Sequence, residues 1–163
     1  MSTSQLFKSK KTKRPIEWII DEEIDGDLLK YLSPQSFQLL SEPDPAVAMT
    51  MSDHLPIDSL THSGWKEKEG DTINIRSLAD QTGFLAACWF FRRCKPIDRV
   101  NKTNGEATKM WLYKARKICP QHMTFGLFLL AAIAMGFAPP QRWKKNENVI
   151  YLCISSNGIY EYT

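Results

Sequence analysis

The sequence predicts an α+β protein with a three-helix core, a C-terminal β-hairpin and one or two strands near the N-terminus. Apolar residues recur at helical spacing in the second half, and segments rich in β-branched and aromatic residues lie before and after them. The chain has 163 residues, of which 43% are hydrophobic, so it can bury one full core. We therefore expect a single globular domain over residues 15–163, preceded by a disordered basic arm over residues 1–14.

Three helices are expected, over about 77–93, 107–118 and 125–135. Ser77 and Thr124 are residues of the kind that cap helix N-termini, and Gly136 is typical of a helix C-terminus. The third helix contains only apolar residues and glycine, so we expect the protein to bury it on all sides. This helix is shorter than the roughly 20 residues that a membrane-spanning helix needs.

The N-terminal half carries weaker signals. Two segments with β-branched or alternating residues, 16–20 and 72–76, are expected to be strands. Residues 42–63 contain three prolines and no clean period, which predicts a long loop. A short strand at 47–51 is an alternative within that loop.

The C-terminal hairpin is expected from two strand-like segments, 148–154 and 159–162, joined by a Ser-Ser-Asn-Gly turn at 155–158. Three helices followed by such a hairpin loosely resemble the winged-helix pattern, from residue 77 to the end. In that family the third helix lies in the major groove of DNA and the hairpin touches the backbone. Because the third helix here has no polar face, the second helix and a basic loop at 141–145 would have to make the contacts instead.

Charge is divided unevenly along the chain. Residues 1–14 carry 5 basic residues and no acid, residues 15–75 carry 13 acidic against 3 basic residues, and residues 76–163 carry 13 basic against 5 acidic residues. Such asymmetry suggests that the basic parts bind an anionic partner. The alternative is that the acidic segment folds back and neutralises the basic half.

These charges lead us to expect a non-catalytic protein that binds nucleic acid, DNA or RNA, mainly through phosphate contacts. The contacts would come from the N-terminal arm, the second helix and the basic loop, namely from Lys10, Lys11, Lys13, Arg14, Lys114, Lys117, Arg142, Trp143, Lys144 and Lys145. Trp143 lies in a polar loop, where no helical pattern assigns its side chain to the core. Its ring is therefore a candidate for stacking on a base. For the basic residues of the helices, the alternative is an ordinary solvated face.

A second function class fits the same chain. It is a structural or assembly protein, viral matrix-like or capsid-associated, that forms homo-oligomers through its apolar helices. The segments 84–91 and 125–135 are apolar enough that one small domain would have difficulty covering both. The basic arm would then contact an anionic membrane surface or nucleic acid.

The sequence predicts no metal or other cofactor. One cysteine–histidine pair has a gap that suits zinc, and two further cysteines could complete a ligand set: Cys119 and His122, with Cys88 and Cys94. The gaps between these cysteines match no paired-cysteine pattern. The acidic turn at 21–27 resembles a calcium loop, but Leu32 stands where such a loop requires a bidentate Glu.

No enzyme motif is present: the chain contains no GxSxG, HExxH, GxGxxG or P-loop sequence. Two histidines lie near acids in the long loop, His54 near Asp53 and His62 near Asp58, and a His–Asp pair can perform acid–base chemistry. Because no nucleophile or substrate pocket accompanies them, we expect neither catalysis nor a small-molecule substrate.

The N-terminal residues are polar and basic, without the apolar segment of a signal peptide. We therefore expect an intracellular, cytoplasmic protein with reduced cysteines. The basic cluster at 10–14 would direct the protein to the nucleus if the host cell is eukaryotic.

Overall fold

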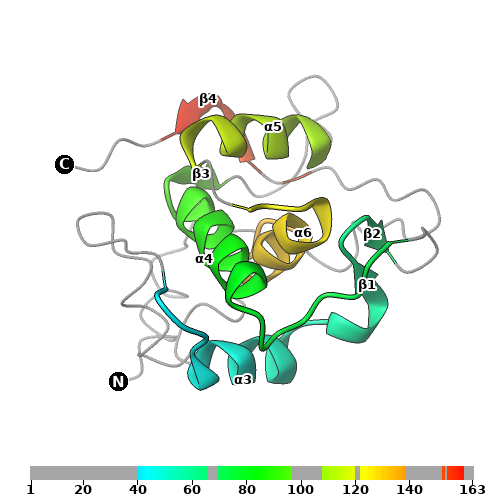
Figure 1. Ribbon diagram of the computed structural model, residues 1–163. Coiled ribbons are helices and arrows are strands. Elements are labelled where there is room, and N and C mark those ends of the chain that lie inside the picture. The colour runs from blue at the N-terminus through cyan, green and yellow to red at the C-terminus, as the bar shows by residue number, and fades with distance from the viewer. Residues whose placement is uncertain are drawn as a thin grey trace, which may run out of the picture.

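The computed structural model describes residues 40–65, 70–96, 108–119, 122–138, 152 and 154–159. These residues form helices and short antiparallel strands, so the predicted α+β class is confirmed (Figure 1). In chain order the elements are α3 (Pro45–His54), the 3-10 helix η2 (Ile57–Ser59), β1 (Leu60–Thr61), β2 (Gly64–Trp65), α4 (Leu78–Arg92), β3 (Cys94–Pro96), α5 (Thr108–Ile118), α6 (Phe125–Ala134) and β4 (Ile154–Ile159).

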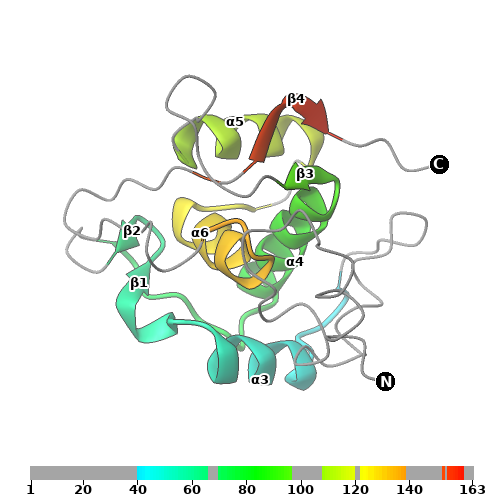
Figure 2. The same ribbon diagram turned by 180° about the vertical axis from the view of Figure 1, so that it is seen from behind.

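The core is built on α4 and α6, which pack against each other in the middle of the molecule. Figures 1 and 2 show α5 on one side of this pair and α3 on the opposite side. Every residue of α6 is buried, as its apolar sequence predicts. Aromatic rings fill the contact: the ring centroid of Phe91 lies 4.8 Å from that of Phe128 and 5.3 Å from that of Phe137. The two most apolar helices are therefore covered within a single chain.

The three predicted helices are confirmed as α4, α5 and α6, and the ends of α4 and α6 carry the expected capping groups. The amide of Asp80 donates to Ser77 Oγ at 3.4 Å, which caps α4. The amide of Leu127 donates to Thr124 Oγ1 at 3.3 Å, which caps α6. Gly136 has a φ of 82°, the left-handed conformation that commonly ends a helix.

The long loop predicted over 42–63 is wrong in its first half, and so is the alternative strand at 47–51, because α3 occupies this segment. Asp44 caps α3 by accepting a hydrogen bond from the amide of Ala46 at 2.9 Å, and a proline follows at the first helical position. Val47 and Met51 are both buried, four residues apart on one helix face. The helix has 10 residues, fewer than three turns, and a spacing of four residues also puts two side chains on one face of a strand, so this short pattern fits either element.

The strand predicted at 72–76 is reduced to one isolated bridge, between Thr72 and Thr61. After it the chain turns toward α4: the amide of Ser77 donates to the carbonyl of Asn74 at 3.0 Å. The amide of Asn74 donates to the side chain of Asp80 instead of to a neighbouring strand. Local polar groups thus compete with the strand ladder and end it.

The C-terminal hairpin is a wrong prediction at its turn, because residues 155–158 lie inside β4. This strand pairs antiparallel with β3, with Cys94 opposite Ile159 and Pro96 opposite Ile154. The register shifts between these two pairs, so residues 155–158 of β4 lie opposite Lys95 alone and form an irregular, bulged part of the strand.

Several expectations fall on residues outside the described ranges: the arm at 1–14, the strand at 16–20, the acidic turn at 21–27 and the basic loop at 141–145. Among the residues that are described, no helix is long and apolar enough to cross a membrane.

Candidate functional site

Helix α5 has one buried and one exposed face. Trp111, Leu112 and Ala115 point into the core and are buried. The exposed side chains are mostly cationic or apolar: Lys109, Met110, Tyr113, Arg116, Lys117 and Ile118. The helix contains no acidic residue, so nothing within it offsets these charges.

Aromatic rings hold the lysines of α5 close to the surface. Lys117 Nζ lies 4.5 Å from the ring centroid of Tyr113, which is 59% exposed. Lys114 Nζ lies 4.3 Å from the ring of the buried Trp111. Each contact is a cation–π interaction, of about 0.5–1 kcal/mol at an exposed site. The result is a positively charged surface with an aromatic ring exposed in its centre.

Arg116 has a structural role in addition to its charge. Its Nε and Nη2 both donate to the carbonyl oxygen of Met123, at 3.0 and 2.7 Å. This bidentate contact fixes α5 to the segment that enters α6. The exposed face of α5 is therefore held in a defined orientation.

Of the residues predicted to contact nucleic acid, the structure describes two, Lys114 and Lys117, and both lie on α5. Lys117 is exposed, whereas Lys114 is half-buried against its tryptophan. Lys109 and Tyr113 share the exposed surface but were not among the predicted contacts. Their spacing of four residues from each other, and of Tyr113 from Lys117, is the signal that places all three on one face. The remaining predicted contacts are outside the described residues: Lys10, Lys11, Lys13, Arg14, Arg142, Trp143, Lys144 and Lys145.

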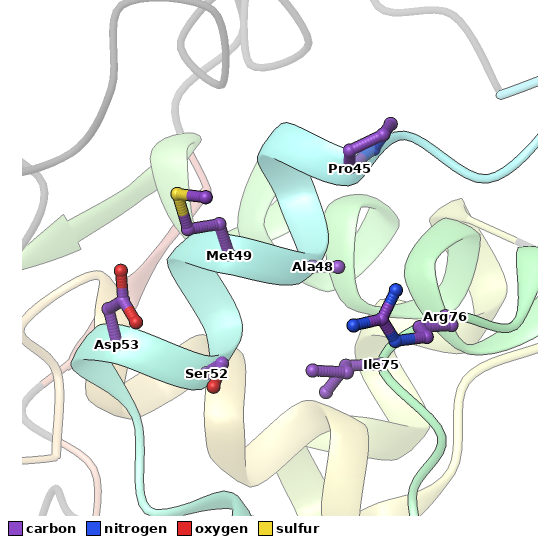
Figure 3. A pocket seen from close by; sticks show the side chains of 7 residues that line it. All are labelled: Pro45, Ala48, Met49, Ser52, Asp53, Ile75 and Arg76. Carbon is purple, nitrogen blue, oxygen red and sulfur yellow. The ribbon is translucent and has the colours of Figure 1, made fainter.

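A hollow of about 360 Å³ lies beside α3, at the other side of the molecule from α5. Figure 3 shows its lining, in which Met49 and Asp53 come from α3 and Arg76 from the segment before α4. One acid and one base face this space, with no histidine or cysteine among the lining residues. The lining also includes the hydroxyl of Ser52, but none of the lining residues is a histidine that could activate this hydroxyl as a nucleophile.

A polar cluster lies where α4 and α6 begin. Nε2 of His62 is 3.0 Å from Oδ2 of Asp80, and Nδ1 of the same ring is 2.7 Å from Oγ1 of Thr124. Nε2 of His122 is 3.8 Å from the other carboxylate oxygen, Oδ1 of Asp80. The pairs considered from the sequence used Asp53 and Asp58, whereas the acid that contacts His62 in the structure is Asp80.

Two glycines allow the histidine-bearing segments to approach the helices. A Cβ at Gly126, in α6, would overlap the carbonyl oxygen of Thr61, next to His62. A Cβ at Gly83, in α4, would overlap the carbonyl oxygen of His122. Glycine is therefore needed at both positions for the backbones to touch. The amide of Gly126 also donates to the carbonyl of His62 at 3.1 Å, which ties this segment to α6.

The cysteines considered as zinc ligands are in the core. Cys88, Cys94 and Cys119 are free and buried. Burial raises the pKa of the Cys119 thiol to about 11, and it raises the pKa values of the other two thiols still further. Among the described residues, the side chains gathered around His122 that could hold a metal are His62 and Asp80, and no cysteine joins them.

Comparisons with protein-family models, with curated proteins and with solved structures find no match to this chain. The chemistry of α5 and of the polar cluster therefore carries the functional assignment.

Proposed function

We propose that this protein binds nucleic acid without catalysis and that the exposed face of α5 is a contact surface. The observation that carries the proposal is the exposure of Lys109, Tyr113 and Lys117 on one face of a helix without acids. Phosphate groups attract such a cationic face, and an exposed tyrosine ring can stack on a base.

The exposed ring of Tyr113 supports a short single-stranded segment as the ligand, because the bases of a single strand are free to stack on it. Lys109 and Lys117 are eight residues apart, which corresponds to about 12 Å along a helix axis. Tyr113 lies halfway between the lysines, where a base could stack while the lysines contact phosphates on both sides.

The basic arm at 1–14 and the loop at 141–145 remain part of the proposal as further phosphate contacts, because their charges have the same sign. A winged-helix arrangement has support from the order of α4, α5 and α6 alone. Since residues 155–158 lie inside β4, which pairs with β3, the proposal uses no wing formed by that segment.

The assembly function was expected because one small domain would have difficulty covering two very apolar helices. Every residue of α6 is buried within the single chain, and so are most residues of α4. Because a single chain covers these helices, we do not propose self-association as the function.

The test is fluorescence anisotropy with a labelled single-stranded oligonucleotide over a series of salt concentrations. Each phosphate contact on a single strand contributes about 0.7 to the slope of log affinity against log salt. The double variant Lys109→Ala with Lys117→Ala should therefore bind more weakly and lower the slope by about 1.4. The control is Arg76→Ala, an exposed cation beside the α3 hollow, which should leave the slope unchanged.

Equal affinity and slope in the double variant and the unmodified chain would contradict the role of α5. A second pair of variants separates the two groups of contacts: removal of residues 1–14, and Arg142→Ala with Lys144→Ala and Lys145→Ala. If these changes abolish binding while the α5 variant binds normally, the arm and loop are the interface and α5 is not.

A further inference from the structure

We propose that His62, Asp80 and His122 form a binding site for one divalent transition-metal ion of the zinc type. The proposed nucleic-acid surface on α5 uses none of these three residues. Their positions, 18 and 42 residues apart in the sequence, match no ligand-spacing pattern, so the sequence alone predicts no such site.

The distances between the donor atoms suit a small metal ion. Two ligands bound tetrahedrally to zinc at 2.0–2.1 Å are about 3.3 Å apart. The carboxylate of Asp80 is 3.0 Å from His62 Nε2 and 3.8 Å from His122 Nε2, and all three ligand atoms lie within 4.8 Å of one another. The side chain of His122 is 54% exposed, so its ring can adjust to shorten the longer distance.

Thr124 supplies the hydrogen-bond partner that metal-binding histidines usually have. Its hydroxyl lies 2.7 Å from Nδ1 of His62 and orients the ring so that Nε2 faces Asp80. When Nδ1 carries the proton and donates it to this hydroxyl, Nε2 has a lone pair for a metal. Without a metal, the threonine hydroxyl can donate to Nδ1 and Nε2–H can donate to Asp80. The cluster therefore satisfies its hydrogen bonds in both states.

Asp80 is also held in place before any ion binds. It lies in the first turn of α4, where a helix N-terminus stabilises a carboxylate. The backbone amide of Asn74 donates to Oδ2 at 2.8 Å, which leaves Oδ1 directed toward His122. The side chain of Asp80 is 8% exposed, so one buried carboxylate supplies the negative charge that a divalent ion needs.

The donor set selects the class of metal. Two imidazoles and one carboxylate suit zinc and its neighbours, whereas calcium and magnesium prefer oxygen ligands throughout. Three protein ligands leave a fourth coordination position open, as in zinc sites that keep a bound water. Because the side chain of His122 is exposed, solvent can reach this end of the cluster.

The experiment uses the full chain without a polyhistidine tag, stripped of metal with a chelator and titrated with Zn²⁺ by calorimetry. We expect one Zn²⁺ per chain. His122→Ala should weaken the affinity at least about tenfold, since even partners of metal ligands contribute about 10–100-fold. His54→Ala, at the end of α3, is the matched control and should bind as the unmodified chain does. Circular dichroism checks that both variants are folded.

Titration with Co²⁺ gives an independent readout, because thiolate ligands produce a strong charge-transfer absorption that nitrogen and oxygen ligands do not. We expect visible cobalt bands without that absorption, and their loss in Asp80→Asn. The proposal is overturned by absent saturable binding, by equal Zn²⁺ affinity in His122→Ala and the unmodified chain, or by a thiolate absorption band. Normal Zn²⁺ binding in a chain that ignores oligonucleotides would leave this site standing and remove the proposed function alone.

Discussion

Helices α5 and α6 are neighbours in sequence and similar in length, with 11 and 10 residues, yet they differ in how much of their surface is exposed. All of α6 is buried and none of it can touch a partner. In α5 the buried face ends at Ala115 and the opposite face presents lysine and tyrosine to solvent. The comparison teaches that packing uses all of α6 but only one face of α5, which leaves the other face of α5 free for the proposed contact. Substitutions in α6 should therefore lower the free energy of unfolding more than substitutions on the exposed face of α5.

The largest effect is expected from emptying the core around α6. Phe128→Ala removes a fully buried ring that contacts Phe90 and Phe91, and it should lower the free energy of unfolding by about 3–5 kcal/mol. Urea denaturation followed by circular dichroism measures the change. A loss below about 1 kcal/mol would show that the neighbouring side chains collapse into the space and that α6 is packed less tightly than the contacts indicate.

The next prediction tests whether an alkylating reagent can reach Cys119, which is buried just after the end of α5. Because burial raises the pKa of Cys119 from 9.0 to about 11, its thiolate fraction at pH 8 is about one hundredth of that of an ordinary thiol. Alkylation of the native chain with iodoacetamide should therefore be at least about a hundredfold slower at Cys119 than in denaturant. Peptide mass spectrometry resolves each cysteine. Equal rates in the two states would contradict the burial of this end of α5.

A smaller effect is expected at the contact between α6 and the segment that bears His62. Gly126→Ala places a methyl group against the backbone of Thr61, and we expect a loss of about 1–3 kcal/mol from overpacking. Alanine in place of glycine within a helix ordinarily stabilises by about 0.5–1 kcal/mol. The sign of the change in unfolding free energy therefore shows whether the backbone of Thr61 lies against this position. A stabilised Gly126→Ala variant, measured by thermal unfolding, would contradict this close approach.

The smallest effect on folding is expected on the exposed face of α5. Lys117→Ala loses one surface cation–π contact with Tyr113 and should change the free energy of unfolding by less than about 0.5 kcal/mol. The same denaturation assay as for Phe128→Ala makes the two helices directly comparable. A loss above about 1.5 kcal/mol would mean that this lysine supports the fold, and the division between the two helices would fail.

The sequence predicted the elements whose signals are local. Ser77 and Thr124 marked helix starts, Gly136 marked an end, and the all-apolar composition of α6 predicted its burial. The short helix α3 was missed because fewer than three turns provide too few apolar positions to define a helical period.

The features that sequence reasoning missed depend on residues far apart in the chain. The edge that β3 provides for β4 is three residues long and includes a lysine and a proline, so it carries no strand signal of its own. The polar cluster likewise requires His62, Asp80 and His122 to meet across the starts of two helices. Glycines at 83 and 126 read as weak helix positions in the sequence, and their role emerges only when the opposing backbones are in place.

The pairing of β3 with β4 has a consequence for how the chain reaches its native state. The strands β1 and β2 join across a tight turn, with Leu60 opposite Trp65, whereas Pro96 must find Ile154, 58 residues further along. Ordering so long an intervening segment is slow, because its entropy is lost before the strand pair forms. We therefore expect β4 to dock last in refolding, so that a late kinetic phase reports on this sheet while helical signals are already complete.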